Sequence, residues 1–133
     1  MEIRHVIITG ASQGIGAALA REYFHQGWFV HLLARNHQAL QDLQKSLNAH
    51  GATRTALYPI DVQDTDALVE LMEQIDTEVN GVDLVVANAG VGAPLQLQQF
   101  SWPALEHATK TNYVGAAATL TALLPRMVKR RGG

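Results

Sequence analysis

The sequence predicts an α/β protein built on a parallel β-sheet. Short, nearly continuous apolar runs alternate with longer segments of helical periodicity, which is the pattern of strands joined by crossover helices. The runs lack polar alternation, as expected of strands covered on both faces. A glycine-rich segment, TGASQGIG, directly follows the first run. At 133 residues and 47% hydrophobic composition, the chain has the size of one compact domain.

Four strands and four helices are expected in alternation. The strands are predicted at residues 4–9, 28–34, 54–60 and 82–87, and the helices at 14–26, 37–50, 64–80 and 101–131. Because parallel strands are joined by right-handed crossovers, the expected sheet order is 3-2-1-4, one half of a doubly wound fold followed by the first helix of the second half. Ligands of such sheets bind where the strand order reverses, here at the carboxyl ends of the first and fourth strands.

Local signals support each helix. Gly27 and Gly51 stand at C-cap positions after the first two, and Gly81 closes the apolar stripe of the third. In the last helix Ser101 is a suitable N-cap, with a proline in the first turn. Asn112 and Gly115 are its expected weak points. Two tryptophans, Trp28 and Trp102, are expected to pack.

Composition excludes several classes of function. The formal net charge of −2 gives no electrostatic reason to expect nucleic acid. The absence of cysteine excludes disulfides, thiolate catalysis and cysteine-ligated zinc, and the six histidines lack the His-x-x-x-His spacing of a metal site. No apolar stretch reaches 18 residues, so we expect no membrane partner and a cytoplasmic protein.

The glycine-rich segment has the composition of a phosphate-binding turn. It lies at a strand-to-helix junction, where small residues let backbone N–H groups and the positive helix N-terminus approach a pyrophosphate. The spacing is Gly-x-x-x-Gly-x-Gly, and no Gly-Lys-Ser/Thr follows, which excludes a triphosphate P-loop. The candidate cofactor-binding residues here are Gly10, Ser12, Gln13, Gly14, Ile15 and Gly16.

TGASQGIG resembles the signature of the short-chain dehydrogenase/reductase family, and the similarity continues through LLARN, DV, NAG and TN. Arg35 and Asn36 of LLARN end the second strand, where dinucleotide-binding proteins that choose NAD usually hold an acid for the ribose 2′-hydroxyl. An arginine pairs instead with the 2′-phosphate of NADP. We therefore expect NADP as the cofactor, with NAD less favoured.

The resemblance implies roles for the remaining candidate residues. Asp61 would accept a hydrogen bond from the adenine amino group, and Val62 would lie against the ring. Asn88 would brace the central strands, while Ala89 and Gly90 leave room for the cofactor ribose. The family usually has a second asparagine where this chain has an alanine, Ala87.

The family's catalytic groups are only partly present. Asn112 matches the asparagine that, as the resemblance implies, supports a water in the proton relay. No Tyr-x-x-x-Lys pair occurs, because the residues four positions after Tyr23, Tyr58 and Tyr113 are glycine, valine and alanine. In the family, the Gly-Gly that ends this chain leads into the strand that carries the catalytic serine.

The sequence therefore predicts one Rossmann-type NAD(P)-binding domain over residues 1–133, incomplete at its C-terminus and inactive alone. The family reaction is hydride transfer between NADP(H) and a small carbonyl or secondary alcohol. We expect a homo-oligomer, formed through the open edge of the fourth strand or through the apolar part of the last helix. A non-catalytic dinucleotide-binding module and a protein-interaction module are the alternatives.

Overall fold

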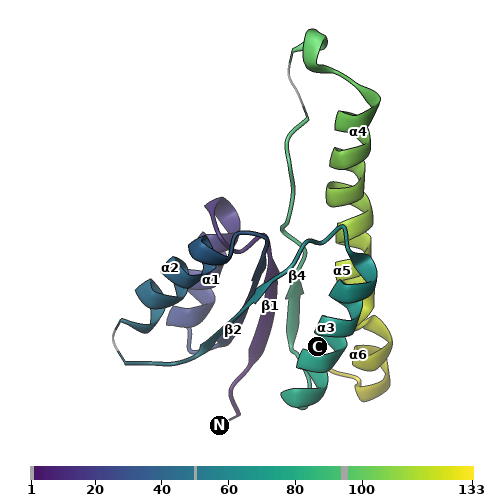
Figure 1. Cartoon of the computed structure of the whole chain (residues 1–133). Coiled ribbons are helices and arrows are strands. Elements are labelled where there is room, and N and C mark those ends of the chain that lie inside the picture. The colour runs from purple at the N-terminus through teal and green to yellow at the C-terminus, as the bar shows by residue number, and fades with distance from the viewer. Residues whose placement is uncertain (1, 50, 94–95) are drawn as a thin grey trace.

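A four-stranded parallel sheet forms the centre of the molecule (Figure 1). The computed structural model describes residues 2–49, 51–93 and 96–133. The strands are β1 (His5–Thr9), β2 (Phe29–Ala34), β3 (Thr55–Pro59) and β4 (Leu84–Val86). Their order is β3-β2-β1-β4, which confirms the predicted order. The reversal point thus lies between β1 and β4, which pair in parallel from Val6 opposite Leu84.

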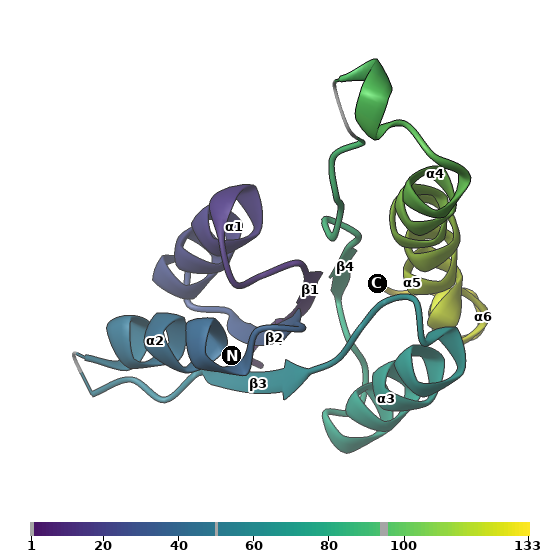
Figure 2. The ribbon, with the colours of Figure 1, turned by 45° about the horizontal axis from the view of Figure 1, so that its top comes forward.

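Helices cover both faces of this sheet, giving three layers (Figure 2). The helices are α1 (Gly14–His25), α2 (His37–Asn48), α3 (Thr65–Glu78), α4 (Trp102–Thr109), α5 (Ala116–Ala122) and α6 (Leu124–Arg130). Two short helical turns are also present. The 3₁₀ turn η1 (Leu97–Gln99) precedes α4, and the π-helical turn η2 (Lys110–Gly115) joins α4 to α5. No helix in the described ranges is long and apolar enough to cross a bilayer.

The pleat of the strands divides the core between two faces. Val6 and Ile8 of β1 pack under α1 and α2, whereas Ile7 between them packs with α3 and α5. All three are fully buried. Because successive strand residues point to opposite faces and both faces are covered, the strands read as continuous apolar runs.

The last helical segment differs from the single helix predicted at 101–131. It is widened at η2, which contains both expected weak points, and it is interrupted at Leu123. Pro125 explains the second break, because proline has no N–H to donate to the carbonyl of Thr121. Gly115 in η2 is buried against Val62, and an added Cβ would lie only 2.7 Å from Val62 Cγ2.

A buried carboxylate holds the end of this segment against α3. Asp76 is only 4% exposed and accepts a hydrogen bond from the backbone N–H of Val82 at 2.8 Å. Arg130 of α6 donates to Asp76 Oδ2 at 3.1 Å and to the carbonyl oxygen of Val82 at 2.6 Å. The arginine thereby links α6 to the end of α3 and to the approach to β4.

The expectation for Trp102 was wrong. Trp28 is buried as expected, at 8% exposure, but Trp102 at the start of α4 is 69% exposed. The reason is that α4 rises beyond the sheet, so its outer side has nothing to pack against among the described residues (Figure 1).

Candidate functional site

A pocket of about 670 Å³ lies at the carboxyl end of the sheet. The loops that follow all four strands contribute to it, together with one residue of η2. The lining residues are Gly10, Ser12, Gln13, Gly14, Ile15, Ala34, Arg35, Asn36, Ile60, Asp61, Val62, Asn88, Ala89, Gly90, Val91 and Thr111. This is the position at which doubly wound sheets bind their ligands.

The three glycines of the first loop have different structural roles. Gly10 has φ of +64°, and an added Cβ would lie 2.7 Å from the Cα of Ala89. Gly16 is buried, and a Cβ there would collide with the carbonyl oxygen of Gly10. Gly14, with φ of +56°, has open space at its Cβ position. Two of the glycines therefore allow tight packing within the protein, and only Gly14 leaves room beside the pocket.

The N-terminus of α1 opens into the pocket without a capping side chain. Helices α2, α3 and α4 begin with Asn36, Asp64 and Ser101, each of which accepts a backbone N–H bond. At the start of α1, Gln13 makes no such bond. Among the described residues, no side chain caps the first N–H groups of α1, and these groups carry the positive end of the helix dipole, about half an elementary charge. An anionic group fits this position.

The loops after β2 and β3 supply opposite charges. Arg35 is exposed on the pocket, and within the described part of the chain its guanidinium forms no hydrogen bond or ion pair. The neighbouring Asn36 lines the pocket and also caps α2. Asp61 Oδ1 accepts the backbone N–H of Gln63 at 2.9 Å, a turn contact that leaves the other carboxylate oxygen available. Val62 beside it is 7% exposed.

The loop after β4 is bonded to the glycine loop. The side-chain amide of Asn88 donates to the carbonyl oxygens of Thr9 and Gly10, each at 3.2 Å. The backbone N–H groups of Asn88 and Ala89 donate to Thr9 Oγ1, each at 3.1 Å. These bonds tie the start of the loop after β4 to the end of β1 and the glycine loop, with Ala87 in the place of a second asparagine.

Asn112 lies outside the pocket lining, at its rim. Its Oδ1 accepts the N–H of Val91 at 2.8 Å, and its Nδ2 donates to the carbonyl oxygen of Val91 at 2.8 Å. An added Cβ on Gly90 would lie 3.3 Å from Asn112 Oδ1, so the loop lies directly against this side chain. Asn112 therefore fixes the backbone that follows Gly90.

The structure brings together nearly all the residues that the sequence singled out. Of the fourteen, Gly16 and Asn112 do not line the pocket but contact residues that do. Sequence reasoning missed Ala34, Ile60, Val91 and Thr111, which also line it. Ala34, Ile60 and Val91 are each next in sequence to a predicted residue, and this adjacency could have identified them. Thr111 depends on how the last helical segment crosses the sheet.

Comparisons with known proteins agree with this arrangement. Residues 4–133 match the family model described as short chain dehydrogenase. An uncharacterized oxidoreductase of Myxococcus xanthus is 40% identical over 133 residues, which cover all of this chain and 52% of the relative. A fatty acyl-CoA reductase of Acinetobacter baylyi is 32% identical over 96% of this chain and 43% of its own. The chain thus spans about half the length of these relatives.

Solved structures of oxidoreductases also superpose closely on this chain. An alcohol dehydrogenase from the archaeon Thermococcus sibiricus, complexed with 5-hydroxy-NADP, superposes with a TM-score of 0.87 at 30% identity, covering 98% of this chain and 56% of that one. A metagenomic short-chain oxidoreductase in complex with NADP superposes with a TM-score of 0.89 at 26% identity, covering 100% and 61%. With its sheet order, its glycine loop and the match over residues 4–133, the chain belongs to the short-chain dehydrogenase family.

Proposed function

We propose that this chain binds NADP(H) in the pocket at the carboxyl end of its sheet, as the cofactor-binding part of an oxidoreductase. The observation that carries the proposal is the uncapped N-terminus of α1, which faces a 670 Å³ pocket beside Gly14. A pyrophosphate there would accept hydrogen bonds from the N–H groups of the first turn of α1. Neighbouring structures that contain NADP or an NADP derivative support the choice of ligand.

Arg35 is the residue that we propose selects NADP over NAD. At 4 Å and an effective dielectric constant of 20, one charge pair is worth about 4 kcal/mol before desolvation, and an acid at this position would make the interaction repulsive. Arg35 lines the pocket at the end of β2 and is exposed, so its guanidinium can reach a 2′-phosphate at small desolvation cost. Ser12 on the adjoining loop can donate a further hydrogen bond.

The other pocket residues would hold the two ends of the dinucleotide. Asp61 and Val62 would contact adenine, and the Asn88–Gly90 loop would contact the second ribose. The bound nicotinamide supplies the hydride chemistry. We propose a small carbonyl or secondary alcohol as the substrate class of the reaction, in line with the relatives named as a reductase and an alcohol dehydrogenase.

We propose that the 133-residue chain alone does not catalyse dehydrogenase or reductase turnover. Its sequence lacks a Tyr-x-x-x-Lys pair, so it has no tyrosine whose pKa a lysine at helical spacing would lower for proton transfer. The same feature favours a second candidate function, a non-catalytic module that binds the dinucleotide and partners another protein. Steady oxidation of NADPH with a panel of ketones by the purified chain would contradict this part of the proposal.

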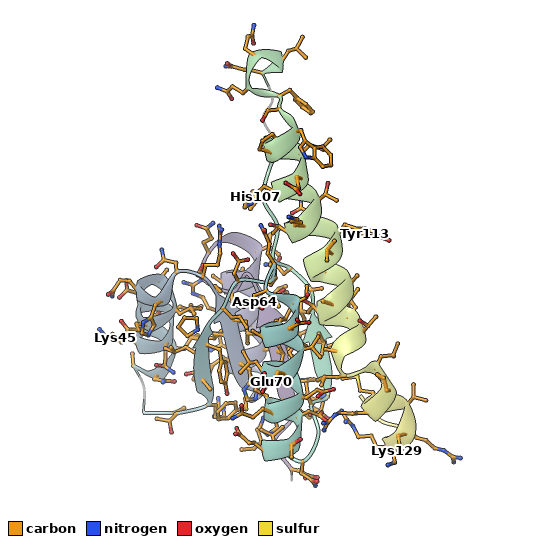
Figure 3. All side chains as sticks on the ribbon, turned by 45° about the vertical axis from the view of Figure 1, so that its right-hand side comes forward. Lys45, Asp64, Glu70, His107, Tyr113 and Lys129 are labelled. Carbon is orange, nitrogen blue, oxygen red and sulfur yellow. The ribbon has the colours of Figure 1, made fainter. Side chains whose placement is uncertain are left out.

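We further propose that the chain self-associates through the outer side of its last helical segment. Residues 111–125 contain no charged side chain, although many of them are exposed. Figure 3 shows Tyr113 pointing away from the sheet, on the opposite side of the helix from His107.

Calorimetric titration tests the cofactor proposal. The native chain should bind NADPH more tightly than NADH, and Arg35→Asp should reverse that order because it replaces attraction to the 2′-phosphate by repulsion. Arg21→Asp, on the exposed side of α1, makes the same charge change outside the pocket lining and is the control. Equal affinity of the native chain for the two nucleotides would refute the role of Arg35, and no binding of either would refute the site.

A further inference from the structure

The turn η2 joins two loops that the sheet itself keeps apart. In the order β3-β2-β1-β4 the loops after β3 and β4 follow the two outermost strands. Three strand spacings separate these strands, roughly 14 Å in all, so no ladder hydrogen bond connects the two loops directly. Both loops nevertheless line the pocket, and η2 contacts each of them.

Two successive side chains of η2 make these contacts. Thr111 Oγ1 accepts a hydrogen bond from Gln63 Nε2 at 2.8 Å, and the same amide nitrogen lies 2.9 Å from His107 Nδ1. Asn112 makes its paired bonds to Val91, both at 2.8 Å. Thr111 is itself 6% exposed and lines the pocket.

Packing reinforces the contact with the loop after β3. Gly115 at the end of η2 lies so close to Val62 that an added Cβ would be 2.7 Å from Cγ2 and 3.1 Å from the carbonyl oxygen. The loop after β3 therefore cannot move closer to η2 unless η2 moves with it. π-helical turns are rare and are frequent at functional sites, which agrees with a role for this one beyond packing.

We propose that Thr111 and Gln63 are positioning residues, which couple the adenosine end of the pocket to the Gly90–Val91 backbone through η2. This inference rests on the proposed NADP site. A ligand that contacts Asp61 and Val62 restrains the loop after β3, the Gln63–Thr111 bond passes the restraint to η2, and Asn112 passes it to Val91. The second half of the dinucleotide then meets a loop that is already ordered, and the coupling is reciprocal.

Hydrogen–deuterium exchange of the Val91 amide, followed by NMR, tests the coupling. The probe is adenosine 2′,5′-bisphosphate, which represents only the adenosine half of NADP and is added at a saturating concentration set by calorimetry for each protein. In the native chain we expect it to slow exchange of this amide about fivefold or more, the lower range of typical allosteric coupling. In Thr111→Val the slowing should fall below about twofold, since the acceptor for Gln63 is lost.

Three further variants complete the test. Thr111→Ser keeps the hydroxyl and should restore the native response, which a merely structural role would not require. Gln63→Met removes the same bond from the other side and should behave as Thr111→Val does. Thr121→Val removes a hydroxyl whose bond lies within α5, to the carbonyl oxygen of Ala117 at 2.7 Å, and should respond as the native chain does.

The outcomes separate this inference from the proposed function. If the bisphosphate binds but Val91 exchange is unchanged in the native chain, or is slowed equally in Thr111→Val and Gln63→Met, the coupling is refuted and the NADP site stands. If neither the bisphosphate nor NADPH binds, the proposed function fails and the coupling fails with it.

Discussion

Two histidines and a tyrosine form a polar cluster on the α3 side of the sheet, in which His31 is buried and His5 and Tyr58 are half-buried. His5 Nδ1 lies 3.1 Å from His31 Nε2, and His31 Nδ1 lies 3.3 Å from the hydroxyl of Tyr58. Burial lowers the pKa of His31 from 6.5 to about 4, with a further contribution from His5. Burial also lowers the pKa of His5, against the opposing charges of Asp83 and Glu2.

The cluster predicts a loss of stability in mild acid. Because the folded-state pKa of His31 is depressed, the unfolded chain binds more protons between about pH 6.5 and 4, and the stabilisation present above pH 6.5 is lost as the pH falls. Between pH 7 and 5 the loss from this group is about 2 kcal/mol. Burial, with a smaller contribution from the charge of Glu78, raises the pKa of Tyr58, so its hydroxyl stays neutral between pH 7 and 5 and does not oppose this effect.

Urea denaturation at pH 7 and pH 5 measures this effect. His31→Gln removes the titrating group but keeps hydrogen-bonding capacity, so its free energy of unfolding should fall by less than that of the native chain over the same interval. The same fall in both proteins would show that His31 is not the group responsible.

The glycines of the first loop predict contrasting substitution costs. Gly16→Ala should lower the free energy of unfolding by about 3 kcal/mol or prevent folding, since the new Cβ collides with the carbonyl oxygen of Gly10. Gly14→Ala should cost only about 1 kcal/mol, from the positive φ alone, because the space around it is open. Equal costs by urea denaturation would contradict the division of roles between these glycines.

At the level of elements, the central strands and the first three helices were predictable because their signals are local. Apolar runs, cap residues and terminal glycines all lie within a few positions of each boundary. The π-helical turn η2 was predictable only as a weak point, since its geometry depends on the contact between Gly115 and Val62. That contact joins segments that are distant in the chain and leaves no local pattern.

The outer side of the last helical segment carries an apolar stripe, which we define as Trp102, Leu105, Tyr113, Leu120, Leu124 and Val128. Each of these side chains is at least 44% exposed. Pairing of such segments from two copies of the chain would cover the stripe.

Self-association through the stripe is testable by light scattering at tens of micromolar. We expect the native chain to form a dimer or a larger species, and Leu120→Lys to shift it toward monomer by placing charge in the interface. Ile3→Lys is the matched control, because Ile3 is 49% exposed but lies outside the stripe. A native chain that is monomeric under these conditions would rule the interface out.

For the whole molecule, the sheet order and the position of the pocket followed from the sequence because crossover handedness leaves few topologies for alternating strands and helices. The exposure of Trp102 and the pocket contribution of Thr111 did not follow from it. Both depend on where α4 and η2 lie relative to the sheet, and that placement is set by long-range contacts such as the Asn112–Val91 pair.

The most direct test of the account is a ¹H–¹⁵N NMR titration of the native chain with NADPH. We predict that the largest shift changes fall on the amides of residues 12–16, on Arg35 and on residues 88–91, and that they saturate together. A spectrum that stays unchanged at high NADPH concentration, or changes confined to residues outside the pocket, would contradict the central claim that the open end of α1 receives a dinucleotide.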